Sequence, residues 1–143
     1  MFQKRKWIRR QDVQLEKNKL FIFGDNMQRV GLGGQAAEMR GEPNALGIPT
    51  KHSPGIGPFD YFTDGEFPKL KPMLDEHFHI VEETLKEGAD VIWPEDGIGT
   101  GLSELPTVAP KIHAYIESKV AEWDKKYGSG SEAGIEEENS ETS

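Results

Sequence analysis

The chain has 143 residues, a length that suits one domain with one sizeable hydrophobic core. It contains no cysteine, which excludes disulfide scaffolds, thiolate metal sites and cysteine nucleophiles. Its formal net charge is −8, and no segment is long and apolar enough to span a membrane, so we expect a soluble, cytoplasmic protein with no membrane partner.

The segment at residues 128–143 is acidic and has one large apolar residue, Ile135. It cannot bury enough apolar surface to offset its loss of conformational entropy, so we predict a disordered acidic tail after a globular domain at residues 1–127. The tail holds five of the 25 acidic residues and none of the 17 basic ones, which leaves the domain with a net charge of −3. This balance argues against nucleic acid as a partner. The basic stretch KRKWIRR near the start could bind nucleic acid, but we interpret it as a solvated terminus.

The first half of the chain alternates short apolar runs with short helical segments. An edge strand is predicted around residues 13–15. The apolar run at residues 20–23 predicts a buried central strand that ends at Gly24. A short helix is expected at residues 35–39, and a second short strand at residues 45–48 is expected to stop at Pro49.

The second half continues the alternation. Residues 51–65 predict an ordered loop, because the three aromatic residues in it need partners to pack against. Apolar residues at helical spacing predict a long helix at residues 69–87, followed by a strand at residues 90–94. A final helix begins near Pro106 and Pro110. The pattern is typical of an α/β fold with three layers, in which helices flank a parallel or mixed sheet, and we expect a mixed one.

Two glycine-rich loops follow predicted strands, and in open α/β sheets ligands bind where strands end. Glycine allows close approach of the backbone to a ligand, and a helix N-terminus behind such a loop favours phosphate. Tight strand-to-helix turns are the structural alternative. Neither loop matches GxxxxGK[ST] or GxGxxG, which argues against a P-loop or a Rossmann dinucleotide site. The candidate ligand-binding residues are Asp25, Asn26, Gly33, Gly34, Gln35, Gly97, Gly99, Thr100, Gly101 and Leu102.

Three polar residues near the strand ends each have two interpretations. Asp25 and Asn26 could bind a base or ribose hydroxyls, or they could form an Asx turn or a helix cap. Lys51 could contact a phosphate or an acyl ester, or it could be a solvated loop lysine. The four histidines show no metal-like clustering, so we expect no metal and no cofactor.

The ordered set of these motifs resembles the macro-domain superfamily, especially the small type that removes ADP-ribose esters from glutamate. The matching stretches are GDN at 24–26, VGLGGQAA at 30–37, GIPTK at 47–51, the helix predicted at 69–87, and PEDGIGTGLSEL at 94–105. The similarity covers about residues 20–120. The chain is more similar still to a family of uncharacterised bacterial and phage proteins that share FGDN, GGQAAEMRGEPNAxGIPTK and WPxDGxGTGL.

The resemblance implies a macro-domain-like fold and a small nucleotide ligand, ADP-ribose or a related NAD-derived compound. It implies that the two glycine loops line the diphosphate and distal ribose, and that Lys51 falls at the position of the catalytic lysine. The glutamate-deacylating type has an aspartate just after the second loop, where this chain has Ser103, or Gly101 in an ungapped register.

Hydrolysis of an ADP-ribosyl ester or glycosidic bond needs a general base near a bound water. The candidates are Asp25, Asp96 and Glu104, with Lys51 as an electrostatic partner. One alternative is a non-catalytic binder that sequesters a nucleotide signal or reads ADP-ribosylated protein. Another is an accessory protein in nucleic-acid processing that uses the basic N-terminus.

Overall fold

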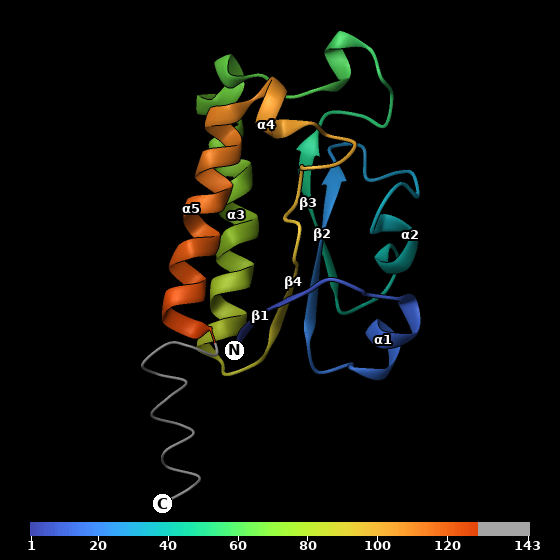
Figure 1. Cartoon of the computed structure of the whole chain (residues 1–143), viewed down its shortest axis with the longest axis vertical. Helices are drawn as coiled ribbons and strands as arrows, with labels where there is room; N and C mark the ends of the chain where they lie inside the picture. The colour runs from blue at the N-terminus through green and yellow to red at the C-terminus, as the bar shows by residue number, and fades with distance from the viewer. Residues whose placement is uncertain (129–143) are drawn as a thin grey trace, which may run out of the picture.

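A computed structural model describes residues 1–128, and the predicted tail, apart from Gly128, lies outside the described residues. A four-stranded sheet lies between two layers of helices (Figure 1). The strands are β1 (Phe2–Arg5), β2 (Leu20–Asn26), β3 (Ala45–Lys51) and β4 (Val91–Pro94). The α-helices are α1 (Arg10–Leu15), α2 (Ala36–Met39), α3 (Phe67–Lys86), α4 (Leu105–Val108) and α5 (Pro110–Tyr127). Two 3-10 helices, η1 (Pro58–Asp60) and η2 (Asp64–Glu66), shape the segment between β3 and α3.

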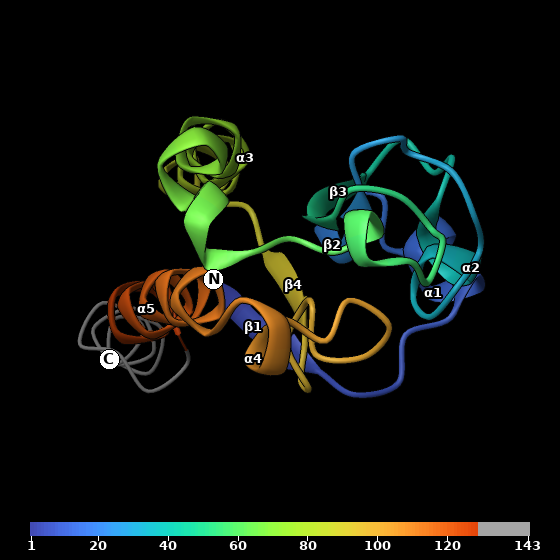
Figure 2. The same ribbon diagram turned by 90° about the horizontal axis from the view of Figure 1, so that it is seen from above.

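The sheet has the strand order β1-β4-β2-β3, and all neighbouring strands are parallel rather than mixed. Helices α1 and α2 lie on one face, and α3 and α5 lie on the other (Figure 2). Successive residues of β2 point to opposite faces, so Phe21 and Phe23 pack with Val13 and Met39 in one core, whereas Ile22 belongs to the other. The α/β class with helices on both faces is therefore confirmed. Covered faces explain why the central strands are apolar on both sides.

The N-terminal segment differs from the prediction. The edge strand is β1, and residues 13–15 lie in α1 instead. A three-residue apolar window cannot distinguish a strand from a helix, and here the first turn of a helix is stabilised by the Asp12 carboxylate, which accepts the Arg9 N–H at 2.9 Å. Because Lys4 and Arg5 are strand residues paired with β4, the basic start is not simply a solvated terminus.

Strands β2 and β3, which lead to the first glycine loop and to Lys51, are longer than predicted. Strand β2 continues through Gly24 and Asp25 to Asn26, and β3 continues through Pro49 to Lys51. Proline is tolerated here because β3 is at the edge of the sheet and has only one strand to pair with. The polar residues at these ends are thus held by strand pairing.

The helices of the second half follow the predicted pattern with one interruption. Helix α3 carries Leu70, Leu74 and Phe78 on its buried side. The predicted final helix is divided into α4 and α5 at Ala109, whose φ is −147° and ψ is 65°. The residue before a proline is disfavoured in the helical region, so Pro110 explains the break. Among the described residues, no helix combines the length and apolar character needed to cross a membrane.

Candidate functional site

The strand order creates a crevice at the carboxyl ends of β2 and β4. These strands are neighbours, yet the chain leaves β2 towards α2 on one face and leaves β4 towards α4 and α5 on the other. Loops that depart to opposite faces leave a gap between them, which is the usual ligand position in open α/β sheets. A cavity of about 310 Å³ lies there, lined by both glycine loops. Its remaining walls come from Gly24, Thr50, Pro94 and, at the rim, Lys6, Glu95 and Asp96.

Glycines shape this cavity by allowing close approach of its two loops. A Cβ atom on Gly24 would lie only 3.3 Å from the backbone nitrogen of Gly99, so the absence of a side chain lets the second loop cross the end of β2. Gly97 and Gly99 have φ values of +87° and +75°, which favour glycine. Gly34 in the first loop also has a positive φ, +56°, and a side chain there would project into open space.

A buried pair of hydroxyls fastens the second loop to the sheet. The Oγ1 of Thr50 lies 2.6 Å from the Oγ of Ser103, and it also donates to the Asp25 backbone oxygen at 3.2 Å. Thr50 is at the end of β3, and both hydroxyl-bearing residues are buried. The loop is therefore fixed to β3 by a side-chain hydrogen bond as well as by packing.

A second cavity of about 190 Å³ adjoins the first. The two share Gly24, Gly33, Leu102 and Ser103. Leu102 is largely exposed, and a Cβ on Gly33 would lie 2.5 Å from its Cδ1, so the leucine packs against the first loop where it lines both spaces. The second cavity is also lined by Asp25, Asn26, Arg40 and Lys51.

The carboxylate of Asp25 is the buried centre of an ion-pair cluster. Its Oδ1 accepts from Arg40 at 2.5 Å and from the Asn26 N–H at 2.8 Å, and its Oδ2 lies 3.2 Å from Arg29. Burial alone would raise the pKa of Asp25, but the hydrogen bonds from Arg40, Asn26 and Arg29 outweigh it and hold the pKa below its usual value. A Cβ on Gly47 would lie 2.5 Å from Oδ2, so this glycine makes room for the carboxylate.

Arg40 and Asn26 also hold the first glycine loop. The Nε of Arg40 donates to the Gly31 oxygen at 2.7 Å. The Asn26 amide donates to Val30 at 2.8 Å, and its Oδ1 accepts from the Gln28 N–H at 3.0 Å, which is the predicted Asx turn. Both residues therefore position the loop, and Asn26 has part of its hydrogen-bonding capacity already in use.

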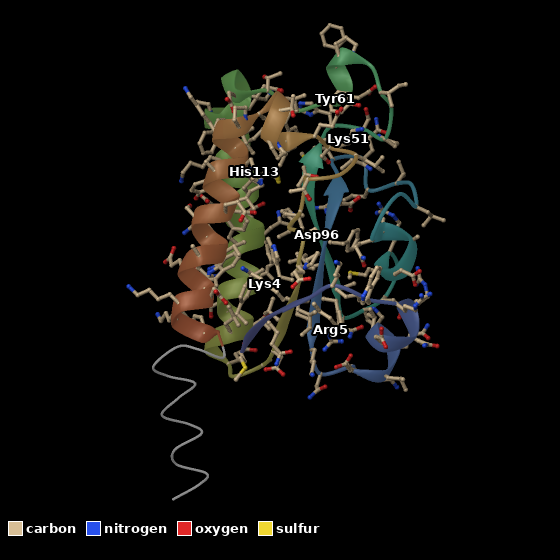
Figure 3. All side chains as sticks on the ribbon, viewed as in Figure 1. Lys4, Arg5, Lys51, Tyr61, Asp96 and His113 are labelled. Carbon is tan, nitrogen blue, oxygen red and sulfur yellow. The ribbon has the colours of Figure 1, made fainter. Side chains whose placement is uncertain are left out.

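Lys51 is buried at the end of β3 and is not a solvated loop residue. Its Nζ donates to the Gly55 oxygen at 2.8 Å and lies 4.4 Å from the centre of the Tyr61 ring. Figure 3 shows Lys51 and Tyr61 together at one end of the molecule. Partial desolvation and the neighbouring Glu104 carboxylate raise the pKa of Tyr61, so its hydroxyl stays protonated at neutral pH.

The structure groups most of the predicted residues around the two cavities. The larger is lined by Gly33, Gly34, Gln35, Asp96, Gly97, Gly99, Thr100, Gly101 and Leu102. The smaller is lined by Asp25, Asn26 and Lys51, again with Gly33 and Leu102. Glu104 lines neither cavity and lies in a left-handed conformation just before α4, with φ +48°.

Sequence reasoning missed Thr50, Lys6 and Arg40. Thr50 had a usable signal, since it precedes Lys51 in the GIPTK stretch and its side chain alternates with that of Lys51 along the strand. Arg40 had none, because its link to Asp25 depends on how α2 packs against β2. Within residues 1–128, no group of three or more potential protein ligands is arranged to hold a metal ion.

The chain belongs to a family described as a family of unknown function (DUF7831), which matches residues 3–119. No curated protein and no solved structure shows a significant match to it.

Proposed function

We propose that the two adjoining cavities bind ADP-ribose or a related NAD-derived nucleotide, in a macro-domain-like α/β fold. The observation that carries the proposal is that both glycine loops line one cavity at the crevice between β2 and β4. Its volume of about 310 Å³, with a second space of about 190 Å³ beside it, suits a ligand made of two linked halves.

Backbone N–H groups supply the phosphate contacts in this proposal. Thr100 and Gly101 are exposed, and the hydrogen bonds among the described residues include none donated by their N–H groups. The N–H groups of Gly34 and Gln35 in the first loop likewise donate none of these hydrogen bonds. Free N–H groups on facing turns are suited to bind an anion such as a diphosphate.

The charges of the smaller cavity favour the distal ribose and its neighbouring phosphate. Lys51 and Arg40 both line it, and only the Arg40 charge is matched there by the Asp25 carboxylate. Asp25 therefore acts by holding Arg40 and the end of β2 in place rather than by contacting the ligand.

A thermal-shift and calorimetry series tests the proposal with ADP-ribose, NAD, ADP and ribose 5-phosphate as probes. A ligand at about 100 times its dissociation constant stabilises the folded protein by roughly 2.7 kcal/mol, which a melting curve resolves. We expect ADP-ribose to give the largest shift, because only it offers a diphosphate with a free distal ribose. Absence of any shift with millimolar ADP-ribose or NAD would reject the proposal.

The position of Lys51 favours hydrolysis of an ADP-ribosyl ester as a second candidate function. Lys51 lines the smaller cavity, which this proposal assigns to the distal ribose. Asp25 is a weak general base because its oxygens already accept hydrogen bonds from arginines and its pKa is lowered. Among the carboxylates predicted as general bases, Asp96 is exposed, but it lines the larger cavity rather than the one that contains Lys51. Release of ADP-ribose from a glutamate-modified peptide is the direct assay.

A further inference from the structure

Trp7 is an exposed aromatic residue that directly follows Lys6, one of the residues that line the larger cavity. The other two tryptophans, Trp93 and Trp123, are 1% and 2% exposed, whereas Trp7 is 77% exposed. A single exposed apolar side chain needs no explanation by itself. The position of Trp7 next to Lys6, a residue that lines the cavity, is what distinguishes it.

The linker between β1 and α1 carries Lys6 and Trp7 away from the end of β1. Arg5 pairs with Pro94, and the Arg5 oxygen accepts the Glu95 N–H at 3.1 Å, so the linker starts beside the second glycine loop. The Lys6 Nζ lies 5.6 Å from the centre of the Trp7 ring. The indole therefore lies near the ammonium of a lysine that lines the cavity.

The two ends of the combined site differ in chemistry. Lys51 and Arg40 lie at the end formed by the smaller cavity, whereas Lys6, Glu95 and Asp96 lie in the larger one. In the view of Figure 3, Asp96 lies between the Lys51–Tyr61 end and residues Lys4 and Arg5 of β1. A ligand whose phosphates and distal ribose occupy the Lys51 end therefore extends its other end towards the linker.

We propose that Trp7 is the stacking platform for the nucleotide base, with Lys6 beside it and the carboxylates of Glu95 and Asp96 accepting N–H or hydroxyl groups of the nucleoside. This inference rests on the proposed function and fixes the direction of the ligand. An indole offers a large flat face at small conformational cost, and base–aromatic stacking contributes substantially to affinity. Trp7 is a specificity residue in this scheme and takes no part in bond breaking.

The test compares ADP-ribose binding by calorimetry in the wild type and in Trp7→Ala, Trp7→Phe and Trp7→Leu. Loss of the stacking face is expected to weaken binding about tenfold, or about 1.4 kcal/mol, in the Ala and Leu variants. Phe keeps an aromatic face and is expected to retain most of the affinity. Trp7 is on the surface, so the melting temperatures should stay close to that of the wild type.

Phe59 provides the matched control, since it is 91% exposed and lies in η1 near the opposite, Lys51 end. Phe59→Ala should bind ADP-ribose as the wild type does. If Phe59→Ala weakens binding and Trp7→Ala does not, the base lies at the other end and the inference is wrong while the proposed function stands. Unchanged affinity in all variants, or equal loss in Trp7→Phe and Trp7→Ala, also rejects it. No binding by the wild type rejects both.

Discussion

The side-chain hydroxyls of Thr50 and Ser103 lie 2.6 Å apart although the two residues are separated by 53 positions in the chain. Thr50 is the penultimate residue of the edge strand β3 and Ser103 belongs to the second glycine loop, so one hydrogen bond connects the sheet to the wall of the cavity. Both groups are buried, and a buried hydroxyl without a partner costs more free energy than the bond itself contributes.

Thr50→Val should therefore lower the free energy of unfolding by about 1–3 kcal/mol, because it keeps the shape and leaves the Ser103 hydroxyl unpaired. Denaturant unfolding measures this loss. The double variant Thr50→Val with Ser103→Ala should recover part of it, since neither partner is then left alone. Thr84→Val is the control: its hydroxyl bonds to Ile80 within α3, and we expect a change of less than about 0.5 kcal/mol. Equal losses of unfolding free energy in Thr50→Val and Thr84→Val would contradict the proposed role of the hydrogen bond between Thr50 and Ser103.

Gly34→Val should weaken ADP-ribose binding more than tenfold, which corresponds to about 1.4 kcal/mol, because the new side chain enters the larger cavity. It should also destabilise the fold, since φ is +56° and β-branched residues are strained there. Gly41→Val separates the two effects. Gly41 also has a positive φ, +91°, with open space where its Cβ would lie, but it lines neither cavity. We expect Gly41→Val to lower the melting temperature about as much as Gly34→Val does, without a change in ADP-ribose affinity. If Gly41→Val loses as much affinity as Gly34→Val, backbone strain alone explains the loss.

Glu16 should contribute to the acid sensitivity of the fold. Hydrogen bonds from Arg5, with further help from Lys19, lower the pKa of Glu16 from 4.5 to about 2. The unfolded state then binds more protons than the folded state between these values, so the stabilisation is complete above pH 4.5 and is lost as the pH falls towards 2. Unfolding curves across this range should be less pH-dependent in Glu16→Gln than in the wild type. Glu87→Gln, at the end of α3, removes the same charge and should keep the wild-type slope.

Lys51→Met should abolish any release of ADP-ribose from a glutamate-modified peptide while it lowers ADP-ribose affinity by a much smaller factor, provided that Lys51 acts in the chemical step. Methionine can occupy the space of the buried lysine stem, so the loop at residues 51–65 should stay folded. Tyr61→Phe is the comparison, because it keeps the aromatic ring under the ammonium. A fully active Lys51→Met enzyme would exclude the lysine from catalysis, and an inactive wild type would leave binding as the function.

The sequence predicted the α/β class and the two glycine loops because both depend on local signals, namely short apolar runs and residues that only turns require. It could not place the ends of β2 and β3, because Asp25 and Pro49 carry loop-like signals that strand pairing overrides. The prediction of a strand around Val13 was wrong, because three residues are too few to distinguish the two-residue repeat of a strand from the 3.6-residue repeat of a helix. Contacts between distant elements, such as Arg40 with Asp25, leave no trace in one sequence.

The two apolar cores on opposite faces of the sheet have a consequence for how the molecule would respond to a ligand. The first glycine loop leads into α2 and thus into one core, whereas the second leads into α4 and α5 and thus into the other. A nucleotide that contacts both loops would link the layer that contains α2 to the layer that contains α5. Amide hydrogen exchange would then slow in α2 and in α5 together on binding, because the two cavities are lined by Ala36 of one core and Ile98 of the other.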